Sequence, residues 1–475
     1  MSDTGFYIGT ERTLNSTGSV FIGGINTPDL DETKYHDNEL ILRGTSAVEF
    51  GQGLDTYMGK ILVGNQESYA GNTNANGDAQ LYKTDSLLTM TTLSPNLVTG
   101  GRAGGDAYGK SVAIGEGKIA VGAPDAPGGG SSDPDYKKGK AFLWDLSTSI
   151  ATTSETGQIE LIDPSPAVKN MFGSIVRIGH GRVAVADGYD VFSGKPGRVN
   201  CYDFTGAHLY TLTGDYFGTT QKDGFGEGNY GNSMDIGHGL IAIGAPGEDN
   251  DLGDGDGVKN TGAVYVFDIK DGIRLFKILP PLTVNPGVSF PYGTHGSTTS
   301  TYESSTTFSL GTSVAIGCGK LVIGDTSARY GGWVHIYDIY GNYERSFNSG
   351  KGGQTETGDN FASSLDVSGG YIIVGTYYDD DGGTQSGNNN TEGSITIFDL
   401  NGNEYATIDA SIPQKDMRYG WKVSITGGKL VVSAPYYSSD DPPAENSNED
   451  GAVFVYDFEE NTDTMVDRAI HGYKY

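Results

Sequence analysis

The sequence predicts an all-β protein, a seven-bladed β-propeller built from four-stranded antiparallel blades. Three observations lead to this prediction: a sevenfold internal repeat, a high glycine content, and a short N-terminal strand that matches a strand missing from the last repeat. The chain has 475 residues, of which 74 are Gly, well above the usual ~7%. The glycines fall between short apolar runs, a pattern typical of many tight turns between many short strands.

The internal repeat is clearest in residues 108–124 and 230–246. Tyr-Gly-Lys-Ser-Val-Ala-Ile-Gly opens the first segment, Tyr-Gly-Asn-Ser-Met-Asp-Ile-Gly opens the second, and both end in Gly-Ala-Pro. The chain holds seven copies, because the same pattern opens at five further residues: Phe50, Phe172, Leu310, Phe361 and Tyr419. Such repetition indicates a repeat architecture rather than the two or three domains that length alone suggests.

Each copy predicts four strands in the same order. A first strand is followed by a short turn such as Ile114-Gly-Glu-Gly117, and a second strand ends near Gly-Ala-Pro. A variable loop leads to a third strand that closes on an aromatic residue, and a fourth strand precedes the next copy. The second strands begin 51 to 80 residues apart. Units of this size cannot bury a core alone, so we expect them to pack as propeller blades.

The closing aromatic residue of the third strand is followed by Asp in every copy but the first. These carboxylates are expected to shape the next turn. The aromatics are Tyr82, Trp144, Tyr202, Phe267, Tyr337, Phe398 and Tyr456, and the carboxylates are Asp145, Asp203, Asp268, Asp338, Asp399 and Asp457.

The two ends of the repeat region predict how the ring closes. The last copy has no clear fourth strand after Tyr456, whereas Glu39-Leu-Ile-Leu42 precedes the first copy where a fourth strand would lie. We therefore expect this N-terminal strand to complete the seventh blade and remove an exposed sheet edge. The predicted organisation is an N-terminal arm or docking segment at 1–38, the propeller at 39–458, and a C-terminal tail at 459–475.

The repeat itself resembles a known family. An aromatic residue with Gly, then Ser-Val, then Val-Gly-Ala-Pro, then Gly-x-Val-Tyr-Val-Tyr is similar to the FG-GAP repeat of integrin α-subunit propellers and related bacterial proteins. The resemblance covers residues ~39–458 and implies the seven-bladed fold. Many FG-GAP repeats carry a calcium loop, Asp-x-Asp/Asn-x-Asp/Asn-Gly, between the first and second strands. Short turns such as Ile178-Gly-His-Gly181 stand there in this chain and lack the required row of oxygen ligands.

The composition excludes several classes of function. The formal net charge of −29 argues against nucleic-acid binding and against docking on anionic lipid. Two cysteines, Cys201 and Cys318, cannot staple a secreted scaffold of this length. No apolar run reaches the ~20 residues of a membrane span, so membrane insertion is not expected. The first residues have no basic n-region or apolar h-region, so no secretory signal is expected.

Acidic residues between the second and third strands of the fourth copy form the candidate metal site. Alternating Asp and Gly could surround Ca²⁺ with carboxylate and carbonyl oxygens. The candidate ligands are Asp249, Asp251, Asp254 and Asp256. A solvated loop is the alternative, and it is favoured because the spacing is not that of an EF-hand. No other cofactor is predicted.

Two further sets of chemically reactive residues recur at fixed positions of the repeat. His180, His238 and Cys318 share the tip of the first turn, and we interpret them as exposed turn residues rather than zinc ligands because each lies in a different blade. Asp55, Asp235 and Asp366 share one position of the first strand. They could form acid–base pairs, but hydrogen bonding within or between blades is the favoured interpretation. No Gly-x-Ser-x-Gly elbow or phosphate loop occurs, so no enzyme is predicted.

Loop lengths predict that the two faces of the ring differ. In an antiparallel blade, the connections after the first and third strands lie on one face and those after the second and fourth on the other. The first set is short almost throughout, whereas the second holds nearly all the length variation. Loops on a rigid scaffold usually carry binding. Tyr with small polar residues is a contact chemistry of low entropic cost. The predicted partner-binding face contains Tyr189, Tyr216, Tyr292, Tyr377, Tyr378, Tyr436 and Tyr437.

The predicted function is therefore a non-enzymatic structural or binding role. The acidic composition, rich in Thr, Ser, Asn, Gly and Tyr, resembles virion proteins of tailed bacteriophages. This resemblance implies a tail or capsid-surface component that contacts other virion proteins or a host-surface glycan or receptor. The alternatives are a bacterial surface adhesion propeller, extracellular without a classical signal peptide, and a glycan-binding or glycan-active propeller.

Overall fold

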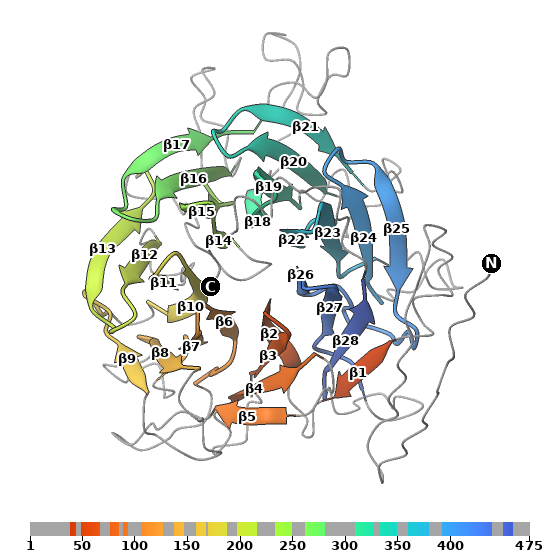
Figure 1. The fold of residues 1–475 in the computed structure, drawn as a ribbon, viewed down its shortest axis with the longest axis horizontal. Helices are drawn as coiled ribbons and strands as arrows, with labels where there is room; N and C mark the ends of the chain where they lie inside the picture. Colours follow the sequence, from red (N-terminus) through yellow and green to blue (C-terminus); the bar gives the residue numbers. More distant parts are fainter. Residues whose placement is uncertain are drawn as a thin grey trace, which may run out of the picture.

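A computed structural model shows seven four-stranded sheets arranged in a ring, which confirms the predicted fold (Figure 1). The residues that the structure describes are 39–43, 49–66, 77–84, 89–93, 106–126, 137–146, 158–167, 170–187, 197–215, 233–248, 262–280, 309–326, 332–348, 360–379, 392–438 and 450–458. They contain strands and turns but no helix. Accordingly, no helix among them is long and apolar enough to span a membrane.

The first four blades each follow the chain in strand order, from the innermost strand to the outermost. Blade one contains β2 (Phe50–Tyr57), β3 (Lys60–Asn65), β4 (Asp78–Lys83) and β5 (Thr89–Leu93). Blade two contains β6 (Ser111–Gly115), β7 (Lys118–Ala123), β8 (Lys140–Asp145) and β9 (Ile159–Leu161). Blade three contains β10 (Phe172–Gly179), β11 (Arg182–Asp187), β12 (Arg198–Tyr202) and β13 (His208–Thr213). Blade four contains β14 (Met234–Gly237), β15 (Leu240–Ala245), β16 (Ala263–Asp268) and β17 (Arg274–Ile278).

The next two blades repeat this order, and the seventh combines both ends of the repeat region. Blade five contains β18 (Leu310–Gly317), β19 (Lys320–Asp325), β20 (Trp333–Asp338) and β21 (Tyr343–Phe347). Blade six contains β22 (Ser364–Ser368), β23 (Tyr371–Thr376), β24 (Ser394–Asp399) and β25 (Glu404–Asp409). Blade seven contains β26 (Val423–Thr426), β27 (Lys429–Ala434), β28 (Ala452–Asp457) and β1 (Leu40–Arg43).

Burial follows the position of each strand in its blade. The second strands are apolar almost throughout and buried on both faces, as in β7 and β11, because each blade packs between two neighbours. The outermost strands are partly exposed, and β13 keeps only Leu212 buried. The apolar clusters lie between adjacent blades; one joins blades six and seven through Ile373, Tyr419 and Phe454. The core is therefore a ring of seven interfaces rather than one central mass.

The N-terminal strand closes the ring as predicted. β1 pairs antiparallel with β28, and Leu40 and Leu42 lie opposite Val455 and Val453. A buried polar network accompanies this pairing. Tyr456 donates a hydrogen bond to Glu39 Oε1 at 2.6 Å, and Tyr419 donates to the Tyr456 hydroxyl at 2.7 Å. Ser411 also donates to Glu39.

The repeated glycines have two distinct structural roles. In the first turn of all seven blades only two residues separate the strands, and both have positive φ, as in Glu116 (φ 49°) and Gly117 (φ 76°). This geometry is that of the type I′ hairpin, which favours Gly. In the Gly-Ala-Pro segment the contact is steric, because a Cβ on Gly122 would overlap the Gly173 carbonyl oxygen of the next blade. The Phe-Gly and Gly-Ala-Pro parts of successive repeats therefore fit against each other.

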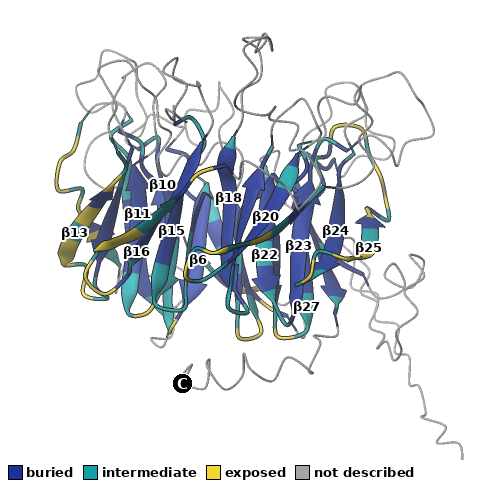
Figure 2. Cartoon of the chain, turned by 90° about the horizontal axis from the view of Figure 1, so that it is seen from above, coloured by how far each residue is buried: buried dark blue, intermediate teal, exposed yellow. Residues whose placement is uncertain are grey.

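The two faces of the ring are defined by these connections. We call the face with the turns after first and third strands the turn side and the opposite face the loop side (Figure 2). Backbone hydrogen bonds join the two kinds of turn in one blade, for example from Ile269 N–H to the Gly239 oxygen at 3.0 Å. One connection departs from the prediction of short turns on this side: residues 146–158 separate β8 from β9.

Candidate functional site

Four of the seven predicted binding-face tyrosines lie in described residues, and all four are on the loop side of blades six and seven. Tyr377 and Tyr378 follow β23, and Tyr436 and Tyr437 follow β27. Tyr189, Tyr216 and Tyr292, together with the candidate calcium ligands Asp249, Asp251, Asp254 and Asp256, lie outside the described residues. The prediction for those positions stays a prediction.

An arginine organises this group of aromatic side chains. The Arg418 guanidinium carbon lies 4.2 Å from the ring centroid of Tyr436, 5.3 Å from that of Tyr378 and 5.7 Å from that of Trp421. The Trp421 ring packs edge-on against Tyr377 at 4.9 Å and against Tyr436 at 6.2 Å. We call Tyr378, Arg418, Trp421 and Tyr436 the aromatic–arginine cluster. Cation–π contacts of this kind fix the arginine in place.

The four tyrosines differ in exposure. Tyr377 and Tyr437 are only 1% and 2% exposed, so their rings belong to the core of the blade interface. Asn360 donates to the Tyr377 hydroxyl at 3.1 Å, and the Arg43 guanidinium lies over the Tyr437 ring. Tyr378 and Tyr436 are half-buried and are the pair available for contact. The sequence shows only that the tyrosines occur in adjacent pairs. It does not indicate which member of each pair is buried and which is available for contact.

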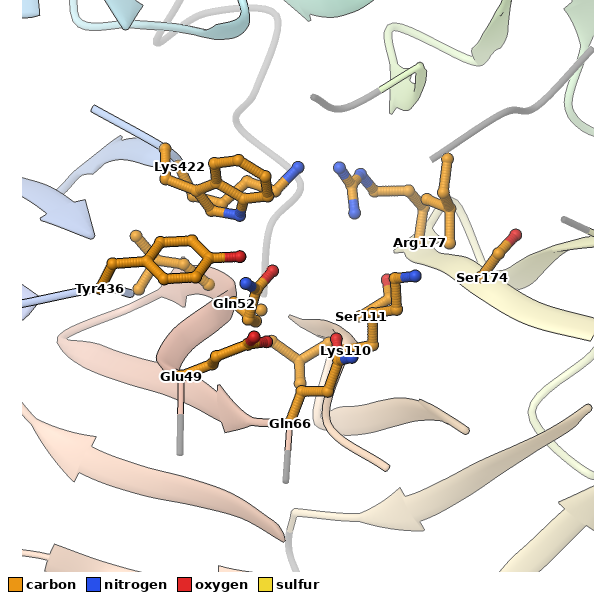
Figure 3. Close-up of a pocket in the computed structure, with 14 residues that line it drawn as sticks. Glu49, Gln52, Gln66, Lys110, Ser111, Ser174, Arg177, Lys422 and Tyr436 are labelled. Carbon is orange, nitrogen blue, oxygen red and sulfur yellow. The ribbon is translucent and has the colours of Figure 1, made fainter. Parts of the chain in front are cut away.

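Beside this cluster, a pocket of about 220 Å³ opens where the loop side meets the centre of the ring (Figure 3). Its walls come from blades one, two, three and seven. Lys422 and Arg177 point toward one another across it, and the Tyr436 hydroxyl also points in. The other polar lining residues are Glu49, Gln52, Gln66, Lys110, Ser111, Ser174 and Trp421. Glu49 is the one carboxylate among the described residues that line it.

The cations of this pocket are partly desolvated. Burial, together with the charges of Arg177 and Lys110, lowers the pKa of Lys422 to about 7. Burial likewise lowers the pKa of Lys110; the carboxylates of Asp125 and Glu49 oppose this shift, and Lys137 adds to it. The Arg177 guanidinium donates to its neighbour, the Val176 carbonyl, at 2.9 Å. Sequence reasoning missed this group because its three members occupy three different positions of the repeat.

On the turn side, the centre of the ring forms a larger cavity of about 740 Å³ that contains the predicted aspartates. Each of the three aspartates accepts a hydrogen bond from the next blade. Asp55 accepts from Ile114 N–H, Asp235 from Ile316 N–H and Asp366 from Ile425 N–H, all at 2.7 Å. These bonds confirm the structural interpretation of the three residues, hydrogen bonding between blades.

Two of these aspartates, Asp55 and Asp366, have strongly shifted pKa values. Burial raises the pKa of Asp55 to about 6 and that of Asp366 to about 7. The Arg177 guanidinium lowers the Asp55 pKa, whereas Asp235 raises both values. A carboxylate with a pKa near neutrality can act as a general base, but these oxygens are already engaged by backbone N–H groups.

The recurring turn-tip residues also connect neighbouring blades. Glu116 accepts hydrogen bonds from His180 N–H and Gly181 N–H, both at 2.8 Å. His180 Nε2 in turn accepts from Gly239 N–H at 3.0 Å, and His238 Nε2 from Gly319 N–H at 3.1 Å. Cys318 Sγ accepts from the next blade in the same manner, from the N–H of Gly370 at 3.4 Å. The predicted exposed turn residues are therefore links between blades.

Comparison with known proteins bears on the repeat. Residues 353–389, which include β22 and β23 of blade six, match the FG-GAP repeat. Among solved structures, BamB from Moraxella catarrhalis is similar at a TM-score of 0.39 and 12% identity, over 86% of this chain and 84% of that one. The search of curated proteins gave no match.

The match to the FG-GAP repeat raises the question of a metal site, because many such repeats carry a calcium-binding loop. Within the described part of the chain, no group of three or more His, Cys, Asp or Glu residues is placed to hold a metal ion. Glu248, which begins the acidic run before the candidate calcium ligands, is buried and forms an ion pair with Lys277. Tyr265 donates to the same carboxylate at 2.7 Å.

Proposed function

We propose that this FG-GAP propeller is a non-enzymatic binding protein of a bacteriophage virion, located at the tail or capsid surface, whose loop side contacts other virion proteins or the host surface. The binding role is supported chiefly by the aromatic–arginine cluster. Tyr, Trp and Arg are the residue types that dominate binding energy at protein interfaces. The placement in a virion rests on the composition of the chain.

The contrast between the two sides supports the same assignment. On the turn side, Glu116, His180, His238 and Cys318 are hydrogen-bonded to the next blade. On the loop side, Tyr378 and Tyr436 are half-buried around an arginine that is held by cation–π contacts. A rigid scaffold with one contact face binds at low entropic cost.

A non-enzymatic role is favoured by how the carboxylates are used. Asp55, Asp235 and Asp366 accept hydrogen bonds from backbone N–H groups of neighbouring blades. One oxygen of each carboxylate therefore holds two blades together, and protonation of that oxygen would have to break the bond. Substitution of these residues is expected to affect stability rather than turnover of any substrate.

Two measurements test the proposal. Mass spectrometry of purified particles from the source phage should detect the chain at a constant copy number, and its absence from intact particles would contradict a virion role. Particles carrying Tyr378→Ser with Tyr436→Ser should then lose at least tenfold in assembly or host adsorption. The matched control is Tyr340→Ser, because Tyr340 is a tyrosine 77% exposed on the turn side. Equal losses in both would place the contact elsewhere.

A further inference from the structure

Three cationic side chains converge on the loop-side pocket of a strongly acidic chain. Lys110 precedes β6 in blade two, Arg177 lies in β10 of blade three, and Lys422 precedes β26 in blade seven. The net charge of the whole protein is −29. The closed ring therefore places three cations from distant parts of the sequence around one pocket. In a chain with so few cationic residues, a random distribution of charge would not be expected to produce such a cluster.

Holding these cations together costs free energy. Like charges repel, and desolvation adds to that cost in a partly buried site. Both effects lower the pKa of Lys422, and Figure 3 shows its ammonium group facing the Arg177 guanidinium across the pocket. Three carboxylates compensate part of this charge: Glu49 in the lining and Asp125 act on Lys110, and Asp55 interacts with Arg177. A bound anion would relieve the remaining repulsion.

Two aromatic side chains, Trp421 and Tyr436, also line the pocket. The Trp421 indole N–H is buried and has no hydrogen-bond acceptor among the described residues. A buried donor of this kind is unfavourable unless it is satisfied. The Tyr436 ring lies beside it, and its hydroxyl points into the pocket. A ligand with a compact apolar face could pack against these two rings, and one of its oxygens could accept from the Tyr436 hydroxyl.

We propose that this pocket binds an oxyanion group, namely a carboxylate, phosphate or sulfate, carried by a small ligand or by the terminal sugar of a glycan. This inference rests on the proposed binding role of the loop side. A volume of about 220 Å³ is below the ~300–1,000 Å³ of pockets that enclose drug-sized ligands. A long polyanion is disfavoured because the net charge of the protein repels it.

Isothermal titration calorimetry of the full chain at constant ionic strength tests this assignment. The titrants are inorganic phosphate, sulfate and glucuronic acid, with glucose as the uncharged reference. At least one oxyanion should bind and glucose should bind at least tenfold more weakly. Lys422→Gln and Arg177→Gln should each weaken the oxyanion by at least tenfold. Lys320→Gln, which removes a lysine paired with Glu344 on the turn side, should change affinity by less than twofold.

A fourth variant, at Trp421, distinguishes an acidic sugar from a simple anion as the ligand. If glucuronic acid binds more tightly than phosphate and sulfate, and Trp421→Ala removes that preference, the ligand is an acidic sugar. If phosphate or sulfate binds at least as tightly as the sugar acid, the ligand is the simple anion or a compound that carries it. Both results support an oxyanion site.

Two results would overturn the inference: no heat of binding for any oxyanion with the wild-type chain, or equal affinity in wild type, Lys422→Gln and Arg177→Gln. Thermal unfolding of each variant confirms folding, and Lys110→Gln replaces either variant that fails to fold. These results are independent of particle adsorption. A loss that depends on Tyr378 and Tyr436 would still support the proposed function after the oxyanion site had been excluded.

Discussion

At the scale of single residues, a half-buried acidic side chain serves as a connection between blades. Asp366 accepts from the Val367 and Ile425 N–H groups at 2.8 and 2.7 Å, and its pKa is raised to about 7 by burial, with Asp235 and Asp55 adding to the rise. The sequence could predict that this position recurs among the repeats. It could not predict the acidity, which depends on how much water the assembled ring excludes from the carboxylate.

The Asp366 pKa leads to a prediction about pH. Because the folded-state pKa lies above the unfolded value of 3.8, the folded state binds the proton more tightly. Its contribution to stability is present below pH ~4 and is lost as pH rises to about 7. Asp366→Asn stays neutral, so its unfolding free energy relative to wild type should rise by up to about 4 kcal/mol between pH 4 and pH 8. Chemical denaturation at both pH values measures this change. A difference independent of pH would contradict it.

Turn chemistry belongs to the same scale and was well predicted. The carboxylates of Asp203, Asp338 and Asp399 accept backbone N–H bonds two and four residues on, as expected for turn-forming aspartates. Asp145 and Asp457 instead pair with Lys118 and Lys429 of the adjacent strand. Those pairs depend on the alignment of neighbouring strands, which the local Asp motif alone does not reveal.

At the scale of strands and turns, the glycine of Gly-Ala-Pro sets the distance between blades. Gly122→Ala should destabilise the protein by on the order of 3 kcal/mol, because the new Cβ overlaps the Gly173 carbonyl oxygen and the backbone must shift. Gly117→Ala is the matched control. A Cβ added at Gly117, where φ is 76°, would meet no atom within 4 Å, so only about 1 kcal/mol of conformational strain is expected. Thermal unfolding measures both, and equal losses would remove the packing explanation.

The elements themselves could be predicted because the repeat displays them seven times. The second strands, the turns and the closing aromatics all lie where the pattern placed them. The binding-face residues were predicted by loop position and residue type, and these criteria could not distinguish buried Tyr377 from half-buried Tyr378. The cationic pocket was missed because Lys110, Arg177 and Lys422 share no repeat position and meet only in the closed ring.

At the scale of the whole molecule, ring closure depends on five residues at the start of the described chain. Removal of residues 1–38 retains β1 and the Glu39 network, whereas removal of 1–43 leaves blade seven with three strands. The longer deletion should lower the midpoint of thermal unfolding by at least 10 °C and cause self-association, because the edge of β28 becomes exposed. The shorter one should change the midpoint by less than about 3 °C. Calorimetry and light scattering measure these effects, and equal behaviour would contradict closure by β1.

We propose that the two sides of the ring differ in function, with the loop side forming the contacts. Tyrosine modification, quantified by mass spectrometry in the free protein and in assembled particles, tests it most directly. Tyr378 and Tyr436 should become at least fivefold less reactive on assembly or host binding. Tyr340 and Tyr405, which are 77% and 40% exposed, should keep their reactivity. Protection of Tyr340 with unchanged reactivity at Tyr378 and Tyr436 would contradict the claim.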